Sequence, residues 1–146
     1  MMKLLRAIAA ATLVAVLTVP AFAADAQHKL AIHVDESDEQ VMNMALNNAK
    51  NVRSYYDEKG ESVDIEIVTY GPGLKMLTAD SPVKDRISAM SLEDENLTFA
   101  ACGNTLAGME KKAGKTIELV SEATVVPSGV VRLMELQEQG YSYVRP

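Results

Sequence analysis

The sequence predicts a single α/β domain, in which a mainly parallel sheet of about five strands lies between layers of helices. Short β-branched or apolar segments alternate along the chain with longer segments whose apolar residues recur every three or four positions. Glycine and proline residues separate these segments at regular intervals. This β-α-β-α order is typical of a parallel sheet with helices packed on both faces.

The first part of the expected domain contains two strands joined by one long helix. Residues 29–34 (KLAIHV) form a short apolar strand, and residues 63–70 (VDIEIVTY) form a β-branched strand. Residues 39–59 between them have the spacing of an amphipathic helix. The acids and the hydroxyl group of residues 35–38 suit the start of that helix, and Gly60 is its natural end.

The middle of the chain is expected to hold a second helix and a third strand. The second strand ends at a turn, residues 71–73 (GPG), and residues 74–77 are expected to form a short helical turn. Pro82 suits the first turn of a helix, which we expect to extend to about Met90 or Leu92. Residues 97–101 (LTFAA) follow as an apolar strand that leads directly into the one cysteine of the chain.

The C-terminal third is expected to add two helices and two strands. The helices are residues 105–112 and 130–139, each followed closely by a glycine. The strands are residues 124–126 and 141–144. Residues 117–120 fit either a strand or irregular chain, and the pattern leaves this choice open.

The first 23 residues have the features of a cleavable export signal, so the mature domain is expected to comprise residues 24–146. Lys3 and Arg6 precede an uncharged apolar run of 13 residues, and residues 21–23 (AFA) form a small-residue cleavage site. A stable membrane anchor needs about 20 apolar residues, and this run is shorter. We therefore expect a periplasmic protein that has no stable membrane anchor after cleavage.

Charge and motif spacing argue against several classes of function. Loss of Lys3 and Arg6 leaves 12 basic residues against 20 acidic ones, a net charge of −8. Nucleic-acid binding requires a basic surface, so nucleic acid is not an expected partner. Residues 108–116 (GMEKKAGKT) resemble a phosphate-binding loop, but five residues separate the glycines where the motif needs four. Two histidines and one cysteine form no spaced set of metal ligands, so neither a metal nor a cofactor is expected.

The unusual chemistry of the chain gathers where the expected strands end, and parallel sheets form their ligand sites at these carboxyl ends. His33 lies near the end of the first strand, and Cys102 follows the third. Gly103 permits a tight turn, and Asn104 or Thr105 can cap the helix that follows. A thiol at a helix N-terminus has a lowered pKa, and the thiolate is the nucleophilic form. Position alone leaves a reactive thiol and an inert buried cysteine equally open.

His33 also has two interpretations. It can lie beside the thiol as an acid, a base or a hydrogen-bond donor to a sulfur anion. The alternative is a histidine whose ring simply bonds to a neighbouring carbonyl. Because Cys102 is the one cysteine of the chain, an internal disulfide is not possible.

Four segments together carry a resemblance to a known family. They are AIHVDE (31–36), YGPGL (70–74), FAACGNTL (99–106) and VVPSGVVRLMELQEQGYSYVRP (125–146). In combination they resemble the DsrE/DsrF-like family from about residue 30 to the end of the chain. The resemblance implies a three-layer α/β/α domain with a parallel sheet of five strands, which often assembles into oligomers.

The same resemblance implies a function. Characterised relatives act in sulfur oxidation and in tRNA thiolation, and they pass sulfane sulfur as a cysteine persulfide. Cys102 matches their sulfur-carrying cysteine, which lies in the loop after a central strand. Together with the export signal, the resemblance therefore predicts a sulfurtransferase-like periplasmic sulfur carrier that forms a homo-oligomer, with an unidentified sulfur donor and acceptor as partners. Cys102 is its expected reactive residue, and His33, Gly103 and Asn104 are its expected binding residues. The alternative is a non-catalytic oligomeric binding module that uses the same strand-end pocket.

Overall fold

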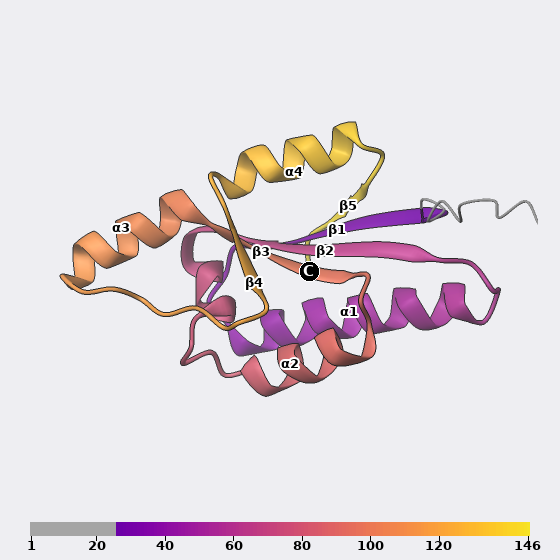
Figure 1. The fold of residues 1–146 in the computed structure, drawn as a ribbon, viewed down its shortest axis with the longest axis horizontal. Helices are drawn as coiled ribbons and strands as arrows, with labels where there is room; N and C mark the ends of the chain where they lie inside the picture. The colour runs from indigo at the N-terminus through magenta and orange to yellow at the C-terminus, as the bar shows by residue number, and fades with distance from the viewer. Residues whose placement is uncertain (1–25) are drawn as a thin grey trace, which may run out of the picture.

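The computed structural model of the protein describes residues 26–146 (Figure 1). The expected export signal, residues 1–23, lies outside the described residues. The described chain contains one five-stranded sheet in the order β4-β3-β2-β1-β5, and every neighbouring pair of strands is parallel. The α/β fold predicted from the sequence is therefore confirmed. In this part of the chain no helix has both the length and the apolar character needed to cross a membrane.

The central strand of the sheet is buried on both faces, and the two edge strands are short. The strands are β1 (His28–Val34), β2 (Val63–Thr69), β3 (Leu97–Cys102), β4 (Ala123–Val126) and β5 (Ser142–Val144). The sequence of β2 is mostly β-branched, as expected for a central strand of a parallel sheet. Short edge strands expose few unpaired backbone groups, which limits unwanted pairing with other chains.

Within the described residues, four α-helices and one 3₁₀ helix connect the strands. They are α1 (Glu39–Asp57), η1 (Gly71–Leu77), α2 (Lys84–Glu93), α3 (Gly103–Ala113) and α4 (Gly129–Glu138). Asp38 caps α1, because its carboxylate accepts hydrogen bonds from the amides of Gln40 and Val41. The segment that the sequence left open, residues 117–120, is irregular chain, with a single antiparallel bridge between Leu119 and Thr78.

The helices divide unequally between the two faces of the sheet. Figure 1 shows α1 and α2 below the sheet, α4 above it, and α3 extending beyond the end of β3. The larger core lies beneath the sheet and includes Phe99, Ile32 and Met42, which are fully buried. The smaller core, under α4, contains Leu133 and Leu136 packed on small sheet residues such as Ala31 and Ala100. These small side chains leave room for α4 to lie close to the sheet.

A nearly buried ion pair fixes α4 to the sheet. The carboxylate of Glu66, on β2, accepts two hydrogen bonds from the Arg132 guanidinium, at 2.7 and 2.6 Å. This bidentate geometry is the strongest form of a carboxylate–arginine contact. Hydrogen bonding to Glu66 raises the pKa of Arg132, so its positive charge is secure. Because Arg132 follows Gly129 by one helical turn, the pair also holds the N-terminus of α4 over the sheet.

Candidate functional site

Cys102 is the last residue of β3 and the N-cap of α3. Its Sγ accepts a hydrogen bond from the Thr105 amide, with a nitrogen–sulfur distance of 3.4 Å. The sulfur therefore occupies the position of the side-chain oxygen that usually caps a helix. The prediction that Asn104 or Thr105 caps this helix is wrong. Helix α3 begins two residues earlier than expected, at Gly103, because Cys102 itself is the cap.

Two helix N-termini meet at the Cys102 thiol. Helix α3 contributes the amides of Asn104 and Thr105, and helix α4 contributes the amide of Gly129, its first residue. Figure 1 shows that both helices begin at the end of the sheet where β3 ends. The Thr105 hydroxyl is a further donor to the sulfur, and it accepts the Gly71 amide at 2.9 Å. Helix N-termini carry partial positive charge, so this arrangement favours a sulfur anion.

The pKa of Cys102 reflects two opposing effects. Burial raises the pKa of the thiol, since the residue is only 4% exposed. The hydrogen bonds from the Thr105 hydroxyl and from the surrounding amides outweigh burial, so the pKa lies below its ordinary value. A thiol at this position is therefore ionised more readily than a free cysteine.

Two glycines allow the backbone to approach Cys102 closely. A Cβ placed on Gly129 would lie 3.0 Å from the Tyr70 side chain and 3.2 Å from Cys102 Cβ. A Cβ on Gly103 would lie 3.1 Å from the carbonyl oxygen of Val126, at the end of β4. A larger residue at position 129 would crowd the Tyr70 and Cys102 side chains. The two glycines thus allow the amide donors of α3 and α4 to meet at the Cys102 sulfur.

Asn104 takes part through its backbone. Its side chain is exposed, and its amide donates to the Pro127 carbonyl at 3.3 Å as well as facing the sulfur. The structure therefore brings Cys102, Gly103 and Asn104 together at one strand end, as the sequence predicts. The contribution of Asn104 does not depend on its side chain.

His33 is buried on the α4 face of the sheet, two strands away from Cys102. Its Nδ1 lies 2.8 Å from the Tyr143 hydroxyl, and its ring stacks on Tyr70 at a centroid distance of 4.4 Å. The other ring nitrogen, Nε2, is buried and has no hydrogen-bond partner. Burial lowers the pKa of His33, and the nearby Asp35 carboxylate opposes this only in part. The ring is therefore neutral near pH 7.

Tyr70 separates the two residues that the sequence placed side by side. Its ring stacks on His33, and its Cβ flanks Gly129 on the same side as Cys102. The ring nitrogens of His33 therefore form no hydrogen bond with the thiol. Burial raises the pKa of Tyr70, and the Asp35 carboxylate raises it further, so the phenol keeps its proton.

Four residues of this site were not predicted as functional: Tyr70, Thr105, Gly129 and Tyr143. Tyr70 follows β2 directly, and Gly129 begins α4 shortly after β4, so the strand-end rule indicates both segments, although it assigns neither residue a role. The role of Tyr143 depends on the pairing of β5 with β1, which periodicity does not reveal.

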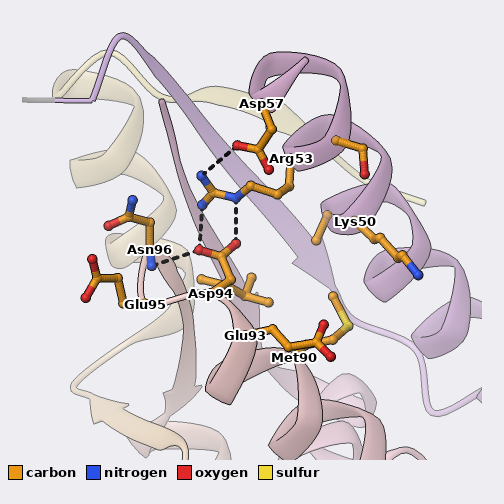
Figure 2. A pocket seen from close by; sticks show the side chains of 11 residues that line it. Lys50, Arg53, Asp57, Met90, Glu93, Asp94, Glu95 and Asn96 are labelled. Atoms are coloured by element: carbon orange, nitrogen blue, oxygen red, sulfur yellow. Dashed lines mark hydrogen bonds and ion pairs between the residues drawn. The ribbon is translucent and has the colours of Figure 1, made fainter. Parts of the chain in front are cut away.

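A cavity lies at the opposite, amino end of the sheet, where α1 and α2 end (Figure 2). Its volume is about 430 Å³. Arg53 crosses it and makes two 2.7 Å hydrogen bonds to the Asp94 carboxylate and a third to the carbonyl of Val63. Asp94 also accepts the Asn96 amide at 2.9 Å. The pairing of these groups with one another indicates a structural role.

Metal binding has no support in the part of the chain that the structure describes. Within residues 26–146, no group of three His, Cys, Asp or Glu side chains is placed to hold an ion. The chemistry available at the described strand ends is that of a single thiol held by hydrogen-bond donors, with the neutral ring of His33 and the Arg145–Asp35 ion pair two strands away.

Comparisons with known proteins agree with this architecture. The model of the DsrE/DsrF-like family matches residues 28–146. A search of curated proteins gave no match. Among solved structures, the chain is similar to MTH1491, a protein of unknown function from Methanobacterium thermoautotrophicum, with 31% sequence identity and a TM-score of 0.70. That similarity covers 82% of this chain and 99% of the other. The protein belongs to the DsrE/DsrF-like family.

Proposed function

We propose that this protein is a periplasmic sulfur carrier that accepts and passes on sulfane sulfur as a persulfide on Cys102. Membership of the DsrE/DsrF-like family indicates a sulfur-relay role. The observation that carries the finer proposal is the convergence of two helix N-termini on the Cys102 sulfur. That convergence lowers the pKa of the thiol and supplies hydrogen bonds to any sulfur anion formed there.

The transfer needs no cofactor and no net oxidant. The Cys102 thiolate attacks the outer sulfur of a donor persulfide, R–S–SH, and a new sulfur–sulfur bond forms while the donor's own bond breaks. The electron pair of the broken bond leaves on the donor sulfur, which departs as R–SH after taking up a proton. In the second half, an acceptor thiolate attacks the outer sulfur, and Cys102 leaves as a thiolate.

The surrounding donors favour both halves of this cycle. The lowered pKa of Cys102 increases the fraction of thiolate available for the attack, and a thiolate held by amides is also a good leaving group for the return. The attached sulfur is more acidic than a thiol, so it is held as an anion by the same donors. Gly103 and Gly129 let the backbone lie close to the sulfur, because a Cβ at either position would crowd its neighbours.

Self-association of this carrier is supported by exposed apolar side chains on α4 and on the two edge strands. These residues lie on β4, α4 and β5 and are at least 38% exposed: Val125, Val130, Val131, Met134, Tyr143 and Val144. Clusters of exposed apolar residues mark protein interfaces. We expect a homo-oligomer, and light scattering that finds a monomer across the micromolar range would contradict this.

Export supplies the proposed location. Residues 1–23 carry the basic start, apolar run and small-residue site described above. N-terminal sequencing of the exported protein is expected to begin at Ala24. An intact Met1 on a cytoplasmic protein would contradict a periplasmic role.

One observation favours the alternative, a binding module without covalent chemistry. The Cys102 thiol is only 4% exposed, while the buried Nε2 of His33 offers a free hydrogen-bonding atom for a ligand. A module of this kind would use the strand ends to hold a small molecule, and its thiol would only fill space.

Sulfur loading distinguishes the two functions. The mature protein is incubated with a low-molecular-weight persulfide, and intact-mass spectrometry counts the sulfur atoms gained. We expect one added sulfur on the wild type and none on Cys102→Ser. The matched control is Cys102→Ser/Ser121→Cys, which moves the single thiol to an exposed position away from the helix N-termini. If the relocated thiol loads as fast and holds sulfur as long as Cys102, the carrier site has no special role.

A further inference from the structure

Nε2 of His33 is the one buried side-chain nitrogen or oxygen without a hydrogen-bond partner among residues 26–146. The residue is 4% exposed, so water does not satisfy this atom freely. An unsatisfied buried polar atom costs on the order of 1–3 kcal/mol. A group left in this state at a strand end, beside a candidate site, is suited to contact a bound molecule.

The Tyr143 hydroxyl determines whether Nε2 of His33 is a hydrogen-bond donor or an acceptor. A neutral imidazole has one N–H group, and its two nitrogens exchange the roles of donor and acceptor. When the Tyr143 hydroxyl donates to Nδ1, at 2.8 Å, the proton of the ring lies on Nε2. A phenol is a better donor than acceptor, because its oxygen shares electrons with the ring. Nε2 is then an N–H donor that no group of the protein uses.

The C-terminal residues hold Tyr143 in place for this contact. Tyr143 is the register partner of Ala31, so the β1–β5 pairing places its backbone two residues before His33. Beyond it, the Arg145 guanidinium donates to Asp35 at 2.8 Å and to Glu36 at 3.1 Å. These two ion pairs hold the chain just after Tyr143 against the end of β1, and the β1–β5 pairing holds the chain before it.

A shared neighbour connects the free N–H of His33 to the sulfur chemistry. The two nitrogens of an imidazole diverge, so Nε2 points away from Tyr143. The other aromatic neighbour of His33 is Tyr70, whose side chain flanks Gly129 together with Cys102. The N–H donor and the thiol thus lie on the two sides of one tyrosine, at the same end of the sheet.

We infer that Tyr143 is a positioning residue: it donates to His33 Nδ1 and so presents Nε2–H to the anionic end of the sulfur-donating molecule. The inference rests on the proposed sulfur-carrier function, and it assigns the donor's class as a small anion, such as a persulfide that carries a carboxylate. His33 contacts the donor molecule, whereas Tyr143 acts only through His33.

The first test is spectroscopic and needs no sulfur chemistry. The full mature chain is labelled with ¹⁵N-histidine, and long-range ¹H–¹⁵N spectra at neutral pH report which nitrogen of His33 carries the proton. We expect Nε2–H alone in the wild type and a mixture of tautomers in Tyr143→Phe, which keeps the ring but lacks the hydroxyl. The control Tyr55→Phe removes an exposed hydroxyl on α1 and should leave the His33 spectrum unchanged. A proton on Nδ1 in the wild type, or an unchanged Nε2–H signal in Tyr143→Phe, would overturn the inference.

The second test measures the rate of loading with cysteine persulfide. We expect Tyr143→Phe to load about tenfold more slowly than the wild type, the size of effect expected when a hydrogen bond to a charged group is lost. Its rate of alkylation by iodoacetamide, a neutral reagent, should not change. In a His33→Phe background, Tyr143→Phe should have no further effect on loading. An equal slowing with and without the imidazole would show that Tyr143 acts independently of His33.

The two proposals fail in different ways. If the wild type gains no sulfur, the carrier function is wrong, whatever the tautomer of His33. If the wild type loads on Cys102 but Tyr143→Phe loads at the same rate, only the role of Tyr143 is wrong.

Discussion

The two ends of the parallel sheet differ in how completely their polar groups are paired. At the amino end, Arg53 and Asp94 form a bidentate pair inside a cavity of about 430 Å³ (Figure 2). The Val63 carbonyl accepts a further hydrogen bond from Arg53, and the Asn96 amide donates one to Asp94. At the carboxyl end, several donors face the Cys102 sulfur, and Nε2 of His33 has no partner. We propose the carboxyl end as the functional end because its hydrogen-bonding capacity is unused, whereas the cavity at the amino end is crossed by paired groups.

The largest expected effect on stability lies at the amino end. Asp94→Ala removes both hydrogen bonds to Arg53 and leaves a largely buried guanidinium without its carboxylate, so we expect a loss of about 2–3 kcal/mol in the free energy of unfolding. Urea denaturation measures it. Asp57→Ala is the matched control: its contact with Arg53 is 4.0 Å long and its side chain is 58% exposed, so the change should be below about 1 kcal/mol. If Asp94→Ala slows alkylation of Cys102, the two ends are not independent.

A smaller loss of stability, accompanied by a change in thiol chemistry, is expected at Gly129. Gly129→Ala introduces a Cβ that crowds Tyr70 and Cys102, so overpacking should cost about 1–3 kcal/mol and move the α4 amide from the sulfur. The pKa of Cys102 should rise as a result. Gly108→Ala, in the interior of α3 with open space around it, should instead stabilise the protein by up to about 1 kcal/mol. Equal effects of the two substitutions would refute the crowding at position 129.

The pH dependence of stability should reveal the buried His33. Because burial lowers its pKa below 6.5, the unfolded chain binds more protons than the folded chain as the medium becomes acidic. Its contribution to stability is therefore complete above pH 6.5 and is lost as the pH falls towards the folded pKa. His33→Phe should have a flatter stability profile over this range in urea titrations. A profile as steep as that of the wild type would assign the acid sensitivity to other groups.

The smallest expected effect comes from removing one side-chain donor to the Cys102 sulfur, the Thr105 hydroxyl, which we compare with the backbone donor Asn104. Thr105→Val keeps the shape of the side chain but removes the hydroxyl that lowers the pKa of Cys102, so that pKa should rise and stability should fall by about 1 kcal/mol. Asn104→Ala retains the amide and removes only an exposed side chain, and should leave the pKa unchanged. The alkylation rate at a fixed neutral pH measures both. A slower reaction in Asn104→Ala would show that the Asn104 side chain matters.

Much of the fold could be predicted because the strong signals are local. The alternation of β-branched strands with periodic helices predicts the parallel sheet, and Gly60 and Gly140 mark turns that the structure confirms. The start of α3 could not be predicted in the same way. A cysteine is not a usual helix cap, so the pattern pointed to Asn104 or Thr105, whereas the sulfur of Cys102 takes that role.

The site was predicted in part, for a similar reason. The strand-end rule places Cys102, Gly103 and Asn104 together, because these residues are consecutive. The partners of His33 come from the turn after β2 and from β5, which lies 110 residues away along the chain. Sequence order does not state that β5 pairs with β1, so neither the Tyr143 contact nor the unpaired Nε2 could be derived from it.

The rate of Cys102 alkylation as a function of pH tests the central claim most directly, because it measures the thiolate itself. The wild type is compared with Cys102→Ser/Ser121→Cys, in which the same chain carries its one thiol at an exposed position. We predict that the rate of the wild type rises at a lower pH than the rate of the relocated thiol, since two helix N-termini stabilise the anion at position 102. A rise at the same pH or at a higher one would contradict the account, because Cys102 would then be an ordinary buried cysteine.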